Sequence, residues 1–134
     1  MRRVGLVILG LSLGIAPSVA QERFDLNCSL QETTSLSPNK PESYSRHLAI
    51  DLSSGKWCYW DSGCNEIRRV ALIGPDEIRT VDIHNDKMTI VTTIDRHTLN
   101  WTGHAETNFF LHATAITIGT CERASFTPFP VSEK

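Results

Sequence analysis

The sequence predicts a mainly β fold, an antiparallel meander of about eight strands that is disulfide-bonded and forms a small barrel or a sandwich. Three observations lead to this fold class. Apolar and polar residues alternate early in the chain, as they do in a half-buried strand. Thr, Ile and Val dominate residues 77–119, in runs separated by short polar turns. After residue 20, no segment has the spacing of a long amphipathic helix.

Residues 1–20 have the pattern of a cleavable secretory signal peptide. Two arginines follow the first methionine, residues 4–16 form an apolar run too short to cross a bilayer, and residues 18–20 end the segment with small side chains. Removal of this segment leaves residues 21–134, enough for one domain with a modest core. We therefore expect a single β domain in the periplasm or secreted from the cell, without membrane insertion.

The first half of the domain is expected to form three strands. Residues 24–31 alternate strictly between apolar and polar side chains. Residues 33–43 contain two prolines and are expected to be a loop. A second strand over residues 44–52 then ends at a turn over residues 53–55, and residues 56–60 return as its hairpin partner.

The second half is expected to add four strands after a less regular segment. Residues 67–73 suit either a strand or one helical turn. The four strands are expected at residues 77–84, 87–94, 99–103 and 108–119, with turns at residues 84–86, 95–98 and 104–107. From about residue 120 the alternation is lost, and we expect an irregular tail whose Phe126 and Phe129 dock onto the sheet.

The four cysteines all follow the signal peptide, so an oxidising compartment makes disulfides the expected state. Three pairings are possible. We favour Cys58–Cys64, which would close a short loop, and Cys28–Cys121, which would tie the first strand to the last. A zinc site is the alternative, but no two cysteines have the spacing of two to four residues typical of zinc ligands.

Charge and motif content restrict the partners of the domain. The formal net charge of −2 becomes −4 once Arg2 and Arg3 leave with the signal peptide, and the charges are spread without blocks. This excludes a basic nucleic-acid surface and a basic face for anionic lipid. The usual catalytic and phosphate-binding motifs are absent, so we expect no enzyme activity, no resident metal and no cofactor.

One group of polar and aromatic residues is a candidate ligand-binding site. Counting turns along the meander places three loops at a common end of the sheet. These loops carry Trp60, Asp61, His84, Asp86 and His104, which could bind a small polar ligand or a metal. The more ordinary interpretation is that these are solvated loop residues beside a disulfide. Of the three tryptophans, Trp60 is expected to be exposed, and the other two to fill the core.

Several short motifs carry a resemblance to known proteins. They are Phe24-Asp25-Leu26-Asn27-Cys28, Leu48-Ala49-Ile50-Asp51-Leu52 leading into Lys56-Trp57-Cys58, Cys64, Thr93-Ile94-Asp95-Arg96, and Cys121 with Phe126. In these motifs the chain resembles small exported bacterial proteins of uncharacterised function. The resemblance implies a periplasmic location and no catalytic residue. Ser54-Gly55-Lys56-Trp57 is similar to the loop of periplasmic hydrolase inhibitors such as lysozyme inhibitors.

Three functional hypotheses follow from the sequence. The first is a non-catalytic module that binds an unknown protein or a small polar ligand through its loops. The second is a hydrolase inhibitor that inserts residues 53–56 or the loop between Cys58 and Cys64 into a target cleft. The third is a small metal-assisted enzyme using His84 and His104 with Asp61 or Asp86. A fold of this class does not choose between these hypotheses.

Overall fold

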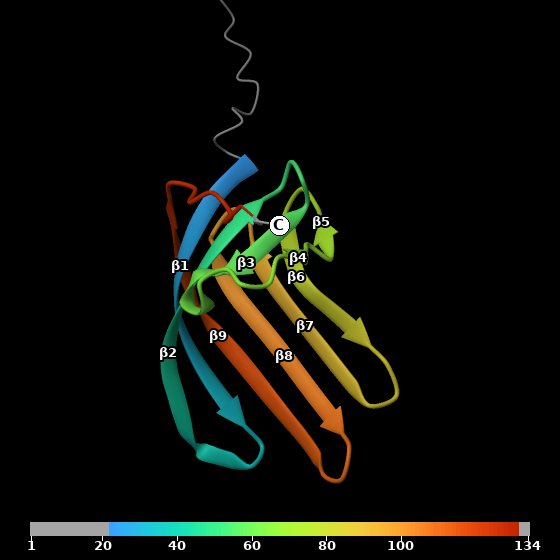
Figure 1. The fold of residues 1–134 in the computed structure, drawn as a ribbon. Coiled ribbons are helices and arrows are strands. Elements are labelled where there is room, and N and C mark those ends of the chain that lie inside the picture. The colour runs from blue at the N-terminus through green and yellow to red at the C-terminus, as the bar shows by residue number, and fades with distance from the viewer. Residues whose placement is uncertain (1–21, 132–134) are drawn as a thin grey trace, which may run out of the picture.

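The computed structural model describes residues 22–131, and the predicted signal peptide lies outside these residues. The chain forms one nine-stranded antiparallel sheet that curls into a half-barrel (Figure 1). In spatial order the strands are β4 (Arg68–Arg69), β3 (Lys56–Tyr59), β2 (Ser37–Asp51), β1 (Arg23–Thr34), β9 (His112–Ala124), β8 (Asn100–Asn108), β7 (Met88–Asp95), β6 (Glu77–His84) and β5 (Leu72–Ile73). A short 3-10 turn, η1 (Trp60–Ser62), follows β3. The antiparallel β fold predicted from the sequence is therefore confirmed.

The two edges of the sheet meet at one end of the half-barrel. β4 and β5 are the edge strands, yet only two residues separate them in the chain. The backbone N–H of Val70 donates to Gly55 beside β3, and that of Ala71 donates to Arg79 in β6. Inside the curl, the indole N–H of Trp57 donates to the carbonyl oxygen of Thr80 at 3.2 Å. Because these bonds join β3 to β6, the half-barrel is closed at this end.

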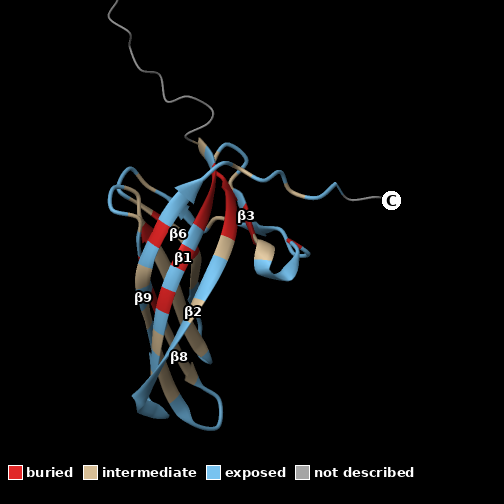
Figure 2. Ribbon diagram, turned by 90° about the vertical axis from the view of Figure 1, so that its left-hand side faces the viewer, coloured by how far each residue is buried: buried red, intermediate tan, exposed pale blue. Residues whose placement is uncertain are grey.

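The main core lies on the concave face at this closed end. Even-numbered residues of β1 from Phe24 to Leu30 point inward and are buried, which is the period-two pattern of the sequence. They pack against Leu48 and Ile50 of β2 and against residues from five other strands, namely Trp57, Ile78, Ile94, Trp101 and Cys121. Figure 2 shows the buried residues gathered in the half of the molecule nearest the described chain ends, with exposed hairpins at the other end.

Both predicted disulfides are present. Cys28–Cys121 joins directly opposed residues of β1 and β9, whereas Cys58–Cys64 closes the loop around η1. The first bond spans 93 residues of sequence. On the chain-entropy model, a loop of this length stabilises the fold by about 4–5 kcal/mol relative to the reduced chain. The disulfide therefore fastens the first strand to the last at the centre of the sheet.

Three expectations about element boundaries were wrong. Residues 33–43 are mostly strand, because β1 and β2 continue to a tight turn after Thr34. Both prolines of this segment lie where the pairing register shifts, on a part of β2 that has no partner other than β1. A strand tolerates proline at an unpaired edge or a bulge. Residues 67–73, for which a strand or one helical turn was expected, contain two short edge strands.

The other two corrections concern β8 and β9. The predicted turn at residues 104–107 is part of β8, and the chain turns instead at residues 109–111. β9 continues to Ala124, so the irregular tail begins after that residue instead of at about 120. Pairing of β9 with β1 causes this extension, since Asp25 lies opposite Ala124. As predicted, Phe126 and Phe129 of the tail dock onto the sheet.

A glycine allows β9 to approach β1 closely. A Cβ atom at Gly119 would lie 2.7 Å from Leu30 Cδ2 and in collision with the carbonyl oxygen of Ser29. At Gly74 an added Cβ would meet its nearest atom, the carbonyl oxygen of Glu77, at 3.4 Å. The two positions therefore form a matched test of this close approach.

We predict that Gly119→Ala lowers the free energy of unfolding by about 1–3 kcal/mol or more, because the strands must separate to accept the methyl group. Urea denaturation of the wild type, Gly119→Ala and the control Gly74→Ala measures the effect. Equal stability of Gly119→Ala and the wild type would contradict the observed strand spacing.

Candidate functional site

The candidate site is a cavity of about 440 Å³ on the concave face. Six strands and the η1 turn form its wall, through Leu30, Glu32, Tyr44, Arg46, Tyr59, Asp61, Ser62, Ile90, Thr92, Trp101, Gly103, His104, Ala105, Ala115 and Thr117. Its volume lies within the range of about 300–1,000 Å³ common for small-molecule sites. The cavity therefore has the size and the mixed lining of a ligand pocket.

Trp101 forms the boundary between the cavity and the core. It is only 5% exposed and lies opposite Gly119 in the β8–β9 register. Its indole Nε1 is 3.4 Å from the position that a Cβ atom at Gly103 would occupy. Gly103 thus leaves space beside the large ring. One side of the ring system packs with the core, and the residue also lines the cavity.

A carboxylate on the cavity wall is held by two hydroxyl groups. The Tyr44 hydroxyl donates to Glu32 Oε2 at 3.2 Å, and the Thr117 hydroxyl donates to the same oxygen at 3.4 Å. Burial raises the pKa of Tyr44 above its usual 10.0, and the charge of Glu32 raises it too, against an opposing effect of Thr117. Tyr44 therefore stays protonated as a donor at neutral pH, and its ring orientation is fixed.

Arg46 lies between two tyrosine rings on the same wall. Its guanidinium carbon is 4.7 Å from the centroid of the Tyr44 ring and 5.9 Å from that of Tyr59. Cations are attracted to aromatic faces at these distances, so the stacking restricts the side chain. Burial, as the main influence, raises the pKa of Tyr59, so this ring is also neutral. The cavity therefore presents a positioned cation beside an engaged carboxylate.

The opposite, convex face of the sheet carries a separate small cluster. Trp60 packs there with Ala49 and the Cys58–Cys64 disulfide, together with the two phenylalanines of the C-terminal tail. Nearby, the buried carboxylate of Asp25 accepts hydrogen bonds from the backbone and hydroxyl of Thr127, at 2.9 and 2.6 Å. His47 Nε2 lies 2.7 Å from Asp25 Oδ2. These contacts hold the tail on the convex face.

The structure does not bring the five predicted site residues together at one cavity. Only Asp61 and His104 line it, and the β7–β8 register places the His104 side chain on the convex face opposite Val91. His84 and Asp86 are exposed at the β6–β7 hairpin, where His84 Nε2 lies 2.6 Å from Asp82 Oδ1. The expected common end assumed a turn at residues 104–107, which is strand.

Trp60 is half-buried against the convex cluster, so the expectation of an exposed ring was wrong. Within residues 22–131, no three side chains of His, Cys, Asp or Glu converge as a set that could hold a metal ion. In the same residues, no helix is long and apolar enough to cross a membrane.

Sequence reasoning missed the polar wall of the cavity, although the sequence contains a signal for it. Glu32 continues the alternation that places Leu30 inward, and Arg46 lies at the same parity as Tyr44 and Leu48. A charged residue on the inward face of a strand indicates that the apolar core ends there and that a binding site can begin. The signal was missed because the spacing of the sequence does not give the β1–β2 register, which brings Glu32 and Arg46 to one wall.

The hairpins beyond the cavity carry exposed apolar residues. The β1–β2 turn and the start of β9 are joined by the Ser35 N–H, which donates to the Thr114 carbonyl at 2.8 Å. Four exposed apolar side chains lie at these two hairpin tips: Leu36, Phe109, Phe110 and Leu111. Figure 1 shows these hairpins at the end of the half-barrel away from the described termini. An apolar ligand or surface would therefore meet apolar side chains at this end.

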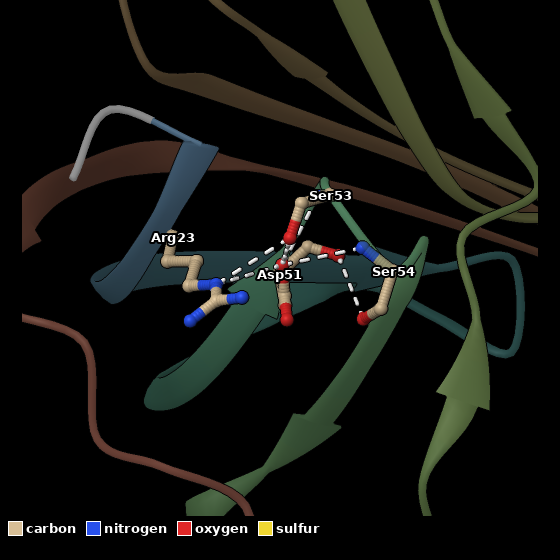
Figure 3. A network of polar contacts seen from close by, with 4 residues as sticks. All are labelled: Arg23, Asp51, Ser53 and Ser54. Carbon is tan, nitrogen blue, oxygen red and sulfur yellow. Dashed lines mark hydrogen bonds and ion pairs between the residues drawn. The ribbon is translucent and has the colours of Figure 1, made fainter. Parts of the chain in front are cut away.

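The β2–β3 turn at the closed end is held by one carboxylate. Asp51 Oδ1 accepts hydrogen bonds from the backbone and hydroxyl of Ser53, at 3.0 and 2.5 Å, and from the Ser54 N–H at 3.3 Å (Figure 3). Arg23 Nε lies 3.4 Å from the same oxygen. Gly55 completes the turn with φ of 70°, which a glycine adopts without strain.

In comparisons with known proteins, no family model matches this chain and no curated protein is significantly similar to it.

The Asp51 network generates a pH-dependent prediction. Burial acts to raise the pKa of Asp51, but the hydrogen bonds from Ser53 and Ser54 and the charge of Arg23 together lower it below its usual 3.8. A carboxylate with a lowered folded-state pKa stabilises the fold above its unfolded pKa, and this stability is lost as the pH falls through the folded pKa.

We predict that Asp51→Asn lowers the free energy of unfolding by about 1 kcal/mol at about pH 6. The difference from wild type should shrink below about pH 4, because the wild-type carboxyl then also becomes neutral. Thermal melts from about pH 6 to about pH 3 measure this difference in stability, with the exposed-loop variant Asp86→Asn as the control. A difference that does not change with pH would contradict the prediction.

Proposed function

We propose that this protein is a non-catalytic binding module of the periplasm or the extracellular space, and that it holds a small ligand in the concave cavity. One observation carries the proposal: an aromatic floor, Trp101, lies beneath a wall that combines apolar residues with a few positioned polar groups. Small-molecule sites have this composition, in which apolar surface supplies affinity and a few polar groups supply orientation.

The proposed location is supported by covalent structure. Both disulfides bury their cysteines in the sheet or against it, and the chain has no free cysteine. Disulfides of this kind form and persist in oxidising compartments. Together with the signal-peptide pattern of residues 1–20, they favour export.

The proposed mode of action is binding without chemistry. A catalytic role on the cavity wall would most readily fall to Glu32. Its carboxylate, however, already accepts hydrogen bonds from Tyr44 and Thr117. Those bonds orient the wall, and they favour a role in shaping the site. The exposed apolar hairpin tips lie at the same end as the cavity wall formed by Ala105 and Ala115, which favours entry of a partly apolar ligand there.

The proposal is tested by filling the cavity. Ala115 lines it, whereas the next residue, Ile116, is exposed on the convex face. We predict that Ala115→Phe weakens binding of the neutral fluorescent probe N-phenyl-1-naphthylamine by about tenfold or more, because the ring occupies the ligand volume. Ile116→Phe should bind the probe as the wild type does.

Fluorescence titration of the three proteins measures this effect. If the wild-type protein bound neither this probe nor an anionic or cationic one, the proposed function would be wrong. Equal binding by Ala115→Phe and the wild type would place the site elsewhere.

Inhibition of a hydrolase is a second candidate function, favoured by the rigid turn at residues 53–56. Inhibitor loops lose little entropy on binding when they are already ordered, and Asp51 holds this turn through three hydrogen bonds. If the protein is an inhibitor, it should slow a lysozyme or a common protease, and Ser54→Trp should relieve the inhibition by about tenfold or more. A lack of inhibition across these enzymes would remove this candidate.

A further inference from the structure

Arg46 is an ordered cation whose hydrogen-bonding capacity is largely unused. Its one intramolecular hydrogen bond among residues 22–131 is a long one, from Nη1 to the Ser45 carbonyl at 3.5 Å. In the same part of the chain, no carboxylate oxygen lies within 4.0 Å of its guanidinium, whereas Arg23, Arg68 and Arg79 each have such a partner. A guanidinium offers five donors in a planar fork. Most of those donors are therefore free for a ligand.

The two carboxylates that share the cavity wall with Arg46 have other partners. Asp61 Oδ2 accepts the backbone N–H of His47 at 2.8 Å. Glu32 accepts the hydroxyl groups of Tyr44 and Thr117. Meanwhile the rings of Tyr44 and Tyr59 hold the Arg46 guanidinium over their faces. The arrangement keeps Arg46 positioned at the cavity without neutralising it.

We infer that the ligand of this cavity is a small monocarboxylate with an apolar body, bound through a charge-assisted pair between its carboxylate and Arg46. This inference rests on the proposed function. The planar fork of an arginine matches the two oxygens of a carboxylate, and such pairs are stronger than neutral hydrogen bonds. The apolar body would lie against the aliphatic and aromatic part of the wall, formed by Leu30, Ile90, Trp101, Ala105 and Ala115.

The charges of the wall disfavour a ligand with more than one negative charge. Glu32 and Asp61 carry two negative charges against the one positive charge of Arg46. A dianion such as a phosphate monoester would meet repulsion from both carboxylates. An organic cation would compete with the Arg46 guanidinium for the faces of Tyr44 and Tyr59. A monocarboxylate gains the pair with Arg46 and meets less repulsion from the two carboxylates than a dianion does.

The experiment compares three ligands of equal chain length, octanoate, octan-1-ol and octylamine, as competitors that displace N-phenyl-1-naphthylamine. Octanoate should displace the probe at about tenfold lower concentration than octanol, because only the carboxylate pairs with Arg46. In Arg46→Gln this advantage should be lost, while displacement by octanol should change little. Arg46→Lys should keep part of it, since a lysine lacks the planar fork.

Arg123→Gln is the matched control. Arg123 also stacks on an aromatic ring, with its guanidinium carbon 4.5 Å from the Phe24 centroid, but it does not line the cavity. This variant should retain the wild-type preference for octanoate. If Arg46→Gln failed to fold, as judged by its melting curve, the three ligands compared on the wild-type protein would still show whether the cavity prefers a carboxylate.

The outcomes separate this inference from the proposed function. Equal displacement by octanoate and octanol, or a preference for octylamine, would overturn the inference and leave a ligand cavity in place. A preference for octanoate that survives in Arg46→Gln would overturn the role of Arg46. No binding of the probe or of any competitor would overturn the proposed function itself.

Discussion

The closure of the half-barrel between β3 and β6 is the constraint on which the rest of this structure depends. The Trp57 indole donates across the interior to the Thr80 carbonyl, and both residues are buried. An indole N–H that is buried without an acceptor would cost free energy, so this bond fixes how far the sheet can open at that end. Because the edge strands meet only there, the curl encloses a packed core at one end and a cavity further along the same face.

The same strand alternation that builds the core also builds the site. Along the inward face of β1, apolar side chains end at Leu30 and are followed by Glu32. Along β2 the inward residues pass from Leu48 to Arg46 and then Tyr44. Trp101 lies at this change, where Gly103 leaves room for its ring. Core and cavity are therefore consecutive parts of one concave surface. The packed core holds the strands in place, and these strands position the residues of the cavity.

Local patterns in the sequence predict the parts of the fold that depend on local chemistry. Alternation located most strands, and the cysteine count together with the predicted signal peptide led to both disulfides. The remaining strand boundaries depend on long-range strand pairing. The β1–β2 arm extends through Pro38 and Pro41 because a bulge absorbs them, and β9 continues to Ala124 because β1 lies beside it. Asp61 was anticipated as a site residue, whereas Glu32 and Arg46 required the β1–β2 register, which sequence spacing alone does not supply.

The central claim is that ligand binds on the concave face at the boundary set by Trp101. The chain's three tryptophans lie in three different places. Trp57 is at the closed end of the half-barrel, Trp60 is on the convex face and Trp101 is at the cavity. The most direct measurement is a ¹⁵N–¹H correlation spectrum of the indole N–H groups during titration with octanoate. The account predicts that the Trp101 signal moves with saturation while the Trp60 signal stays in place. Movement of Trp60 with an unchanged Trp101 would contradict it.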